Sequence, residues 1–128
     1  MRGKEDLELY KISKNKISIT RGDSAYLDIN IFNEDGTAYI LHDGDTVQAQ
    51  VRTEPNIGEL LIDASLENGK IYVNDNGAIV WHIFPADTRN LEIGTYSYDV
   101  QIVTADGDVF TFIEDSDFRV TNEVTWHE

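Results

Sequence analysis

The chain contains no cysteine, and it has few of the residues that usually carry catalysis or metal binding. Without thiols it can hold neither a disulfide bond nor a thiolate metal site. Its three histidines, His42, His82 and His127, form no His-x-x-x-His pair, and no Gly-x-Ser-x-Gly nucleophile elbow occurs in the sequence. We therefore expect a protein that is not an enzyme and that needs no cofactor and no metal.

Basic residues are also scarce. There are 10 Lys and Arg against 24 Asp and Glu, a formal net charge of −14 at pH 7. A charge of this sign repels nucleic acids and anionic membrane surfaces, so we expect neither as a partner. No apolar run approaches the ~18 residues of a membrane span, and the N-terminus lacks the apolar stretch of a secretory signal. The acidity favours solubility, and it would also suit a cation site or a basic partner.

No long segment repeats like an amphipathic helix. Short stretches instead alternate apolar and polar residues, which is the pattern of strands with one buried face. Glycine-containing turns separate them, as in Asn33-Glu34-Asp35-Gly36 and Ala105-Asp106-Gly107-Asp108. The pattern predicts an all-β, immunoglobulin-like antiparallel sandwich of about eight short strands. We expect the strands within residues 16–20, 25–32, 37–41, 47–52, 60–66, 78–84, 96–103, 109–113 and 117–121.

The segment Leu91-Glu92-Ile93-Gly94-Thr95-Tyr96 supports this fold most strongly. It has the Leu-x-x-Gly-x-Tyr form of a tyrosine corner, in which the tyrosine hydroxyl bonds to upstream backbone at the start of a strand. Pro85 begins a segment that fits one helical turn just before this corner.

The length of 128 residues suits a single domain. We expect an N-terminal arm at residues 1–15, the sandwich at residues 16–122 and a C-terminal tail at residues 123–128. The predicted core comprises Ile19, Leu27, Ile29, Ile31, Val47, Ala49, Val51, Val80, Tyr96, Tyr98, Val100, Ile102 and Phe112.

Three short patterns allow other interpretations. Asp-rich turns such as Asp43-Gly44-Asp45 could bind calcium, although Asp and Gly are also ordinary turn residues and no loop has the spacing of an EF-hand. Aromatic residues such as Tyr26, Tyr39 and Trp126 could form a surface for sugar. Arg21-Gly22-Asp23 spells an integrin-recognition triplet, but its place between two predicted strands favours a tight turn.

Several segments follow one another in a familiar order: Ile19-Thr20-Arg21-Gly22-Asp23-Ser24, Asp35-Gly36-Thr37-Ala38-Tyr39, Asp43-Gly44-Asp45-Thr46-Val47, Pro85-Ala86-Asp87-Thr88, the tyrosine corner, and Asp106-Gly107-Asp108-Val109-Phe110. Together they span residues 16–121. They resemble the N-terminal domain of baseplate upper proteins and related tail structural proteins of phages that infect Gram-positive bacteria.

This resemblance implies a β-sandwich without catalysis that holds an adsorption device to a phage or prophage tail. It implies other tail or baseplate proteins as partners, a possible homo-oligomer, and a place in the virion after assembly in the host cytoplasm. In that family Asp87 and Thr88 belong to a short turn with a capping role.

For the surface that contacts partners, the sequence indicates Leu7, Leu9 and Tyr10 in the arm and Trp126 in the tail, because exposed apolar residues near termini often mark contacts. The alternative function is an adhesion module that binds carbohydrate or calcium.

Overall fold

The computed structural model describes residues 11–13, 16–54 and 58–122 of the chain. Within them the chain forms nine strands and one short helix. The elements are β1 (Lys11–Ser13), β2 (Lys16–Thr20), β3 (Ala25–Ile29), β4 (Thr46–Arg52), β5 (Leu60–Ser65), β6 (Ile71–Val73), β7 (Ile79–Ile83), α1 (Pro85–Arg89), β8 (Gly94–Val103) and β9 (Val109–Thr121).

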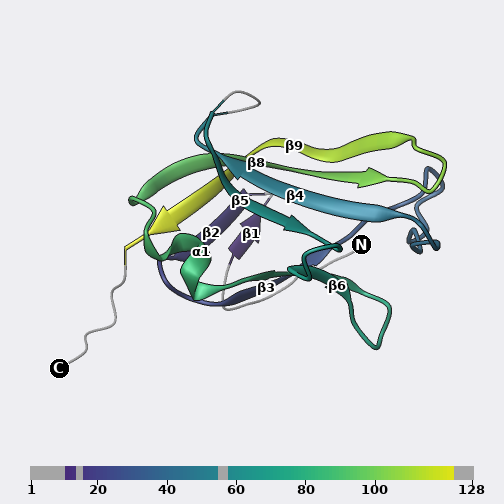
Figure 1. Ribbon diagram of the computed structural model, residues 1–128, viewed down its shortest axis with the longest axis horizontal. Helices are drawn as coiled ribbons and strands as arrows, with labels where there is room; N and C mark the ends of the chain where they lie inside the picture. The colour runs from purple at the N-terminus through teal and green to yellow at the C-terminus, as the bar shows by residue number, and fades with distance from the viewer. Residues whose placement is uncertain (1–10, 14–15, 55–57, 123–128) are drawn as a thin grey trace.

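The strands form two sheets (Figure 1). The larger sheet has six strands in the order β1-β2-β9-β8-β4-β5, and the smaller has three in the order β3-β7-β6. All pairings are antiparallel except that of β2 with β9, which is parallel. A β9-β8-β4-β5 sheet facing a β3-β7-β6 sheet corresponds to the G-F-C-C′ and B-E-D sheets of an immunoglobulin-like sandwich, so the predicted fold is confirmed.

The alternation read from the sequence sets which side chains meet between the sheets. In β4, Val47, Ala49 and Val51 are fully buried, while the intervening glutamines are partly exposed. Trp81 from the smaller sheet packs against both Tyr98 and Phe118 of the larger one, with ring centroids 6.0 Å away in each case. The buried cluster comprises Ile17, Ile19, Ala25, Leu27, Ile29, Val47, Ala49, Val51, Ile62, Ala64, Ile71, Ile79, Trp81, Ile83, Tyr98, Val100, Ile102, Phe118 and Val120.

Most of the predicted core residues belong to this cluster, and four need comment. Ile31 and Tyr96 are only partly buried and pack against its rim. Val80 is buried but belongs to the outer face of the smaller sheet, because its neighbours Ile79 and Trp81 point inward. The side chain of Phe112 lies outside the described part of the structure.

The predicted strands differ from the observed ones at several places. Residues 37–41 form no strand, and Ala38 makes only an isolated bridge with Phe32. The strands expected at 109–113 and 117–121 are one strand, β9, because its register against β8 shifts twice and the shifts break the alternation. The strand β6 (Ile71–Val73) was not predicted, since its three residues are too few to show a period.

The region between β7 and β8 forms as predicted. Pro85 begins α1, and the carboxylate of Asp87 accepts the backbone N–H of Phe84 at 2.9 Å, which caps the first turn. Thr88 is fully buried, and its Oγ1 accepts the backbone N–H of Gly22 at 2.8 Å. Asp87 therefore has the expected capping role, whereas Thr88 ties α1 to the turn between β2 and β3.

The tyrosine corner is confirmed. The hydroxyl of Tyr96 donates a hydrogen bond to the backbone carbonyl of Glu92 at 2.6 Å, and this bond fixes the bend by which the chain enters β8.

Replacing Tyr96 with phenylalanine removes this bond and leaves the ring in place. We expect Tyr96→Phe to lower the free energy of unfolding by about 1 kcal/mol, the usual net worth of one hydrogen bond. Tyr72→Phe is the matched control, because Tyr72 is 37% exposed and its hydroxyl has no hydrogen bond within the described residues. Urea unfolding of both variants measures the difference, and equal effects would contradict a structural role for the corner.

Candidate interaction surfaces

The residues that the sequence indicated for partner contacts, Leu7, Leu9, Tyr10 and Trp126, lie outside the described residues, so that interpretation stays a prediction. Among the residues that are described, no three or more His, Asp or Glu side chains gather in a way that could hold a metal ion. No helix in the same part of the chain has the length and apolar character to cross a membrane.

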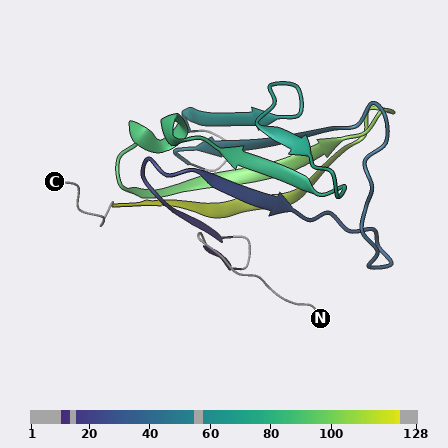
Figure 2. The ribbon, with the colours of Figure 1, turned by 90° about the horizontal axis from the view of Figure 1, so that it is seen from below.

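Two segments far apart in the sequence meet at one end of the sandwich. They are the crossover between β3 and β4, residues 30–45, and the β8–β9 hairpin, residues 103–110; we call them together the loop–hairpin end. Figure 2 shows them at the opposite end of the molecule from α1. The hairpin closes on Thr104, whose backbone N–H donates to the carbonyl of Asp108 at 2.8 Å.

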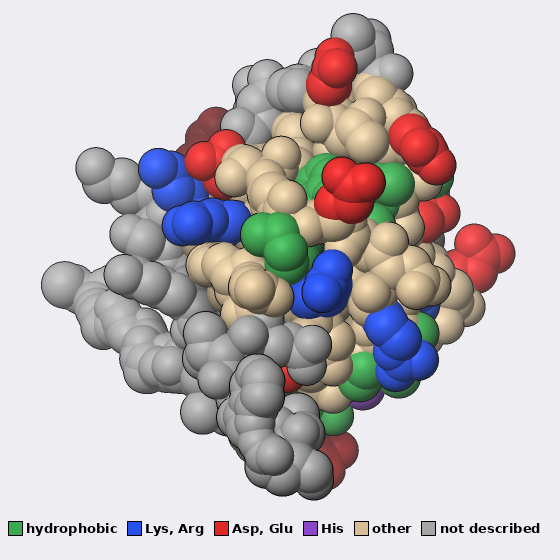
Figure 3. All heavy atoms as spheres, turned by 90° about the vertical axis from the view of Figure 1, so that its left-hand side faces the viewer, with side chains coloured by type: hydrophobic (Ala, Val, Ile, Leu, Met, Phe, Trp, Pro, Cys, Tyr) green, Lys and Arg blue, Asp and Glu red, His purple; other side chains and the backbone are tan. Residues whose placement is uncertain are grey.

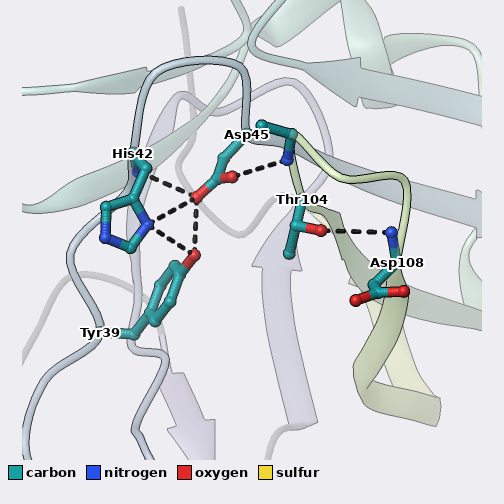
Figure 4. A network of polar contacts seen from close by, with 6 residues as sticks. Tyr39, His42, Asp45, Thr104 and Asp108 are labelled. Atoms are coloured by element: carbon teal, nitrogen blue, oxygen red, sulfur yellow. Dashed lines mark hydrogen bonds and ion pairs between the residues drawn. The ribbon is translucent and has the colours of Figure 1, made fainter.

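Asp45 joins the two segments (Figure 4). Its Oδ2 accepts the hydroxyl of Tyr39 at 2.6 Å and the backbone N–H of His42 at 2.9 Å. Its Oδ1 accepts the backbone N–H of Ala105, in the hairpin, at 3.0 Å. The residue is only 8% exposed, so three donors compensate the buried carboxylate. Asp45 thus holds the loop both to itself and to the hairpin.

These bonds favour the ionised form of Asp45. The hydroxyl of Tyr39, followed by the backbone N–H of His42, lowers the pKa of Asp45 below its ordinary value. The same bond to Asp45 raises the pKa of the Tyr39 phenol. The imidazole of His42 lies at the rim of the group, with Nδ1 3.2 Å from the hydroxyl of Tyr39 and 3.5 Å from Oδ2 of Asp45. Because one carboxylate accepts from Tyr39, His42 and Ala105, the group holds the loop in place, and we call it the Asp45 clamp.

Gly44 lets the loop approach the hairpin closely. Its φ is +92°, and a Cβ added there would lie 2.8 Å from the Cβ of Ala105. Glycine is therefore required at this position both for the backbone conformation and for the contact.

The loop–hairpin end exposes large apolar side chains. Phe32 is 63% exposed, Ile40 77%, Val109 56% and Phe110 55%. Phe110 pairs with Ile102, which is only 4% exposed and belongs to the core. Phe110 therefore extends an inner-face row of the larger sheet to a place where little covers it.

Basic residues are distributed unevenly between the loop–hairpin end and the opposite end of the sandwich. No Lys or Arg occurs in residues 22–51 or 90–118, which include the whole loop–hairpin end. That end carries Glu34, Asp35, Asp43, Asp45, Asp106 and Asp108. At the opposite end, Lys and Arg side chains stand among carboxylates (Figure 3). The loop–hairpin end is thus the acidic end of an acidic protein.

A second group of aromatic side chains covers the outer face of the smaller sheet. The ring of His82 stacks on Tyr26 with centroids 4.2 Å apart and planes at 19°, and on Phe84 at 3.8 Å and 29°. Lys70 lies beyond Phe84, with Nζ 5.9 Å from the ring centroid, and bonds to Asp87 at 2.6 Å. Rings this close face one another and do not lie side by side, so their faces form no flat platform for a sugar ring.

The Arg21-Gly22-Asp23 triplet lies in the turn between β2 and β3. Gly22 has a φ of +85°, and its N–H is held by Thr88. The guanidinium of Arg21 is partly buried and donates to the carbonyl of Leu91 at 3.4 Å. The geometry favours a packed turn over a protruding recognition loop.

Comparison with known protein families gives no match to the chain, and a search of curated proteins finds no significant sequence similarity.

The close approach at Gly44 predicts a specific steric effect. Alanine at either Gly44 or Gly36, both at positive φ, should cost about 1–2 kcal/mol for the left-handed backbone. Gly36 has open space around it, so Gly36→Ala is the matched control. In urea unfolding, we expect Gly44→Ala to lower the free energy of unfolding by about 1 kcal/mol more than Gly36→Ala does. Adding Ala105→Gly should remove the excess, and its persistence would contradict the contact.

The lowered pKa of Asp45 predicts a pH dependence. A carboxyl group whose pKa is lowered by folding stabilises the folded state above its unfolded pKa of about 3.9 and loses that effect as the pH falls through the folded value. The urea midpoint of Asp45→Asn should therefore lie furthest below that of the unsubstituted protein near pH 7, and the gap should narrow below about pH 4. The amide resonances of His42 and Ala105 should titrate with Asp45 in NMR spectra.

Asp43→Asn is the control, because the exposed Asp43 side chain makes no hydrogen bond in the described residues. It should leave the midpoint nearly unchanged at both pH values. A gap for Asp45→Asn that is the same at pH 3 and pH 7 would contradict the proposed clamp.

Proposed function

We propose that this chain is a non-enzymatic structural or assembly module of a phage tail or baseplate and that it acts through protein–protein contacts. The observation that carries the proposal is the loop–hairpin end. There Phe32, Ile40, Val109 and Phe110 are more than half exposed on two segments that Asp45 holds together.

Single exposed apolar residues are common, but several on adjoining, fixed segments mark a docking surface. Rigid presentation also favours binding, since less conformational freedom is lost when the partner docks. The clamp at Asp45 and the close approach at Gly44 supply that rigidity without forming a catalytic group.

The phage context rests on the resemblance of the turn and strand segments between residues 16 and 121. It implies other tail or baseplate proteins as partners, with self-assembly into a ring as a further possibility. On this proposal the protein resides in the virion and reaches it during assembly in the host cytoplasm.

Electron microscopy tests this function directly. Phage particles induced from the source strain are incubated with gold-labelled antibodies raised against the purified chain. We expect label at the tail tip or baseplate of intact particles. Antibody absorbed beforehand with the purified chain is the control and should give no label.

The chain should also join partners through the loop–hairpin end. When the gene is replaced by one encoding Ile40→Ser and Phe110→Ser, we expect fewer particles with the label. The control is Ile93→Ser, because Ile93 is 46% exposed but lies between α1 and β8, away from the loop–hairpin end. This change should leave labelling unchanged. Particles without label in the unsubstituted strain would contradict the proposal.

A further inference from the structure

The first part of β9 has a strand on one side only among the described residues. Residues Val109–Ile113 pair with β8, whereas β2 pairs only with Phe118–Thr121 at the far end of β9. In Figure 1 this part of β9 lies at the margin of the larger sheet. We call residues 109–113 the β9 edge. An edge of this kind presents backbone N–H and C=O groups to any extended segment that approaches it.

Among the described sheet margins, the β9 edge combines five consecutive residues with the absence of any charged side chain. Its five residues, Val109-Phe110-Thr111-Phe112-Ile113, include no charged group. By contrast, β1 has Lys11, β3 has Asp28 and β5 has Asp63 within the strand, and β6, which is also uncharged, has only three residues. Charged residues on edge strands oppose strand pairing, so the β9 edge is the margin best suited to accept another strand.

Acidic residues stand on both sides of this uncharged segment. Asp106 and Asp108 precede it in the hairpin, and Glu114, Asp115 and Asp117 follow it. Residues 90–118 contain no Lys or Arg, so all charged residues in this stretch of sequence around the segment are acidic. The complement of such an edge is an extended segment with an apolar, uncharged centre and basic residues at its ends.

A second copy of the chain does not fit this description. If two β9 edges paired in antiparallel fashion around Thr111, Asp108 of one copy would oppose Glu114 of the other. Like charges placed across a strand pair are destabilising, and each whole chain carries a net charge of −14. The charge pattern therefore selects a different, basic partner.

We propose that the β9 edge is a strand-addition site for an extended, lysine- or arginine-flanked segment of a partner protein. The segment extends the larger sheet by one strand, and its apolar side chains cover Phe110 at the end of the inner-face row. This inference rests on the proposed assembly function and names the class of partner that docks.

A designed peptide tests the site on the full chain. The probe alternates threonine and valine between pairs of lysines. One control peptide has glutamates in place of the lysines, and a second keeps the lysines but has N-methylated valines, which cannot donate to a β-ladder. Backbone amide resonances of the protein, recorded by NMR up to millimolar peptide, report where each peptide binds.

We expect the lysine peptide to shift the amides of residues 109–113 and to bind at least about tenfold more tightly than either control. Its binding should weaken with added salt, because charges at the surface are screened. Asp108→Lys should weaken binding about tenfold. Asp75→Lys, an equal change at an exposed turn of the smaller sheet, should leave it within about twofold.

Three outcomes would overturn the proposal: no binding of the lysine peptide, shifts centred elsewhere, or equal binding of the N-methylated peptide. A fourth such outcome would come from light scattering: if the protein is a dimer and Asp108→Lys makes it a monomer, the β9 edge binds a second copy of the chain. The labelling experiment is independent of all four. Peptide binding without particle label would retain the strand-addition site and reject the phage assignment, whereas label without peptide binding would do the reverse.

Discussion

The contact between the two sheets is the interaction on which the rest of the structure depends, and a cluster of buried apolar side chains makes it. No disulfide can cross this interface, because the chain has no cysteine. Trp81 crosses instead, with its ring against Tyr98 and Phe118, and Tyr98 meets the ring of Phe118 edge-on at 6.3 Å. Tyr98 follows the corner residue Tyr96 by two positions, which is where antibody domains have their second inter-sheet cysteine. An aromatic group thus takes the place of the covalent link, and burial raises the pKa of the Tyr98 phenol.

The unequal size of the sheets links this core to the exposed surface. Six strands face three, so the smaller sheet cannot cover the whole inner face of the larger one. The smaller sheet stops covering the larger one along a row of paired residues on β4, β8 and β9. The exposed fraction of the side chain rises along this row from 0% at Val47 to 4% at Ile102 and 55% at Phe110. The crossover at residues 30–45 passes near this place, and the carboxylate of Asp45 fixes it to the hairpin. The apolar surface of the loop–hairpin end is therefore a consequence of the same architecture that builds the core.

The sequence predicted those parts of the fold in which local pattern and tertiary packing agree. Val47, Ala49 and Val51 alternate without interruption, and the corner at Tyr96 has its own short motif, so both were found. The segment 37–41 is rich in apolar, aromatic and β-branched residues but does not alternate; Tyr39 turns toward Asp45 and the strand does not form. In β9 the register shifts hide the continuity of one long strand. The clamp itself could not be predicted, because Asp45 and Ala105 are 60 positions apart and only the fold brings them together. The one signal for that surface was the lack of Lys and Arg in residues 22–51 and 90–118.

The same charge pattern bears on the risk of aggregation at an apolar sheet edge. An uncharged edge such as Val109–Ile113 is a hazard, because identical chains can pair along it and aggregate. Carboxylates on both sides of the edge, added to a net charge of −14, oppose pairing of two copies along this edge. On the proposed strand-addition site, the same carboxylates attract a basic segment. On this proposal, acidity at this end opposes pairing of two copies along the β9 edge and favours a partner of opposite charge there.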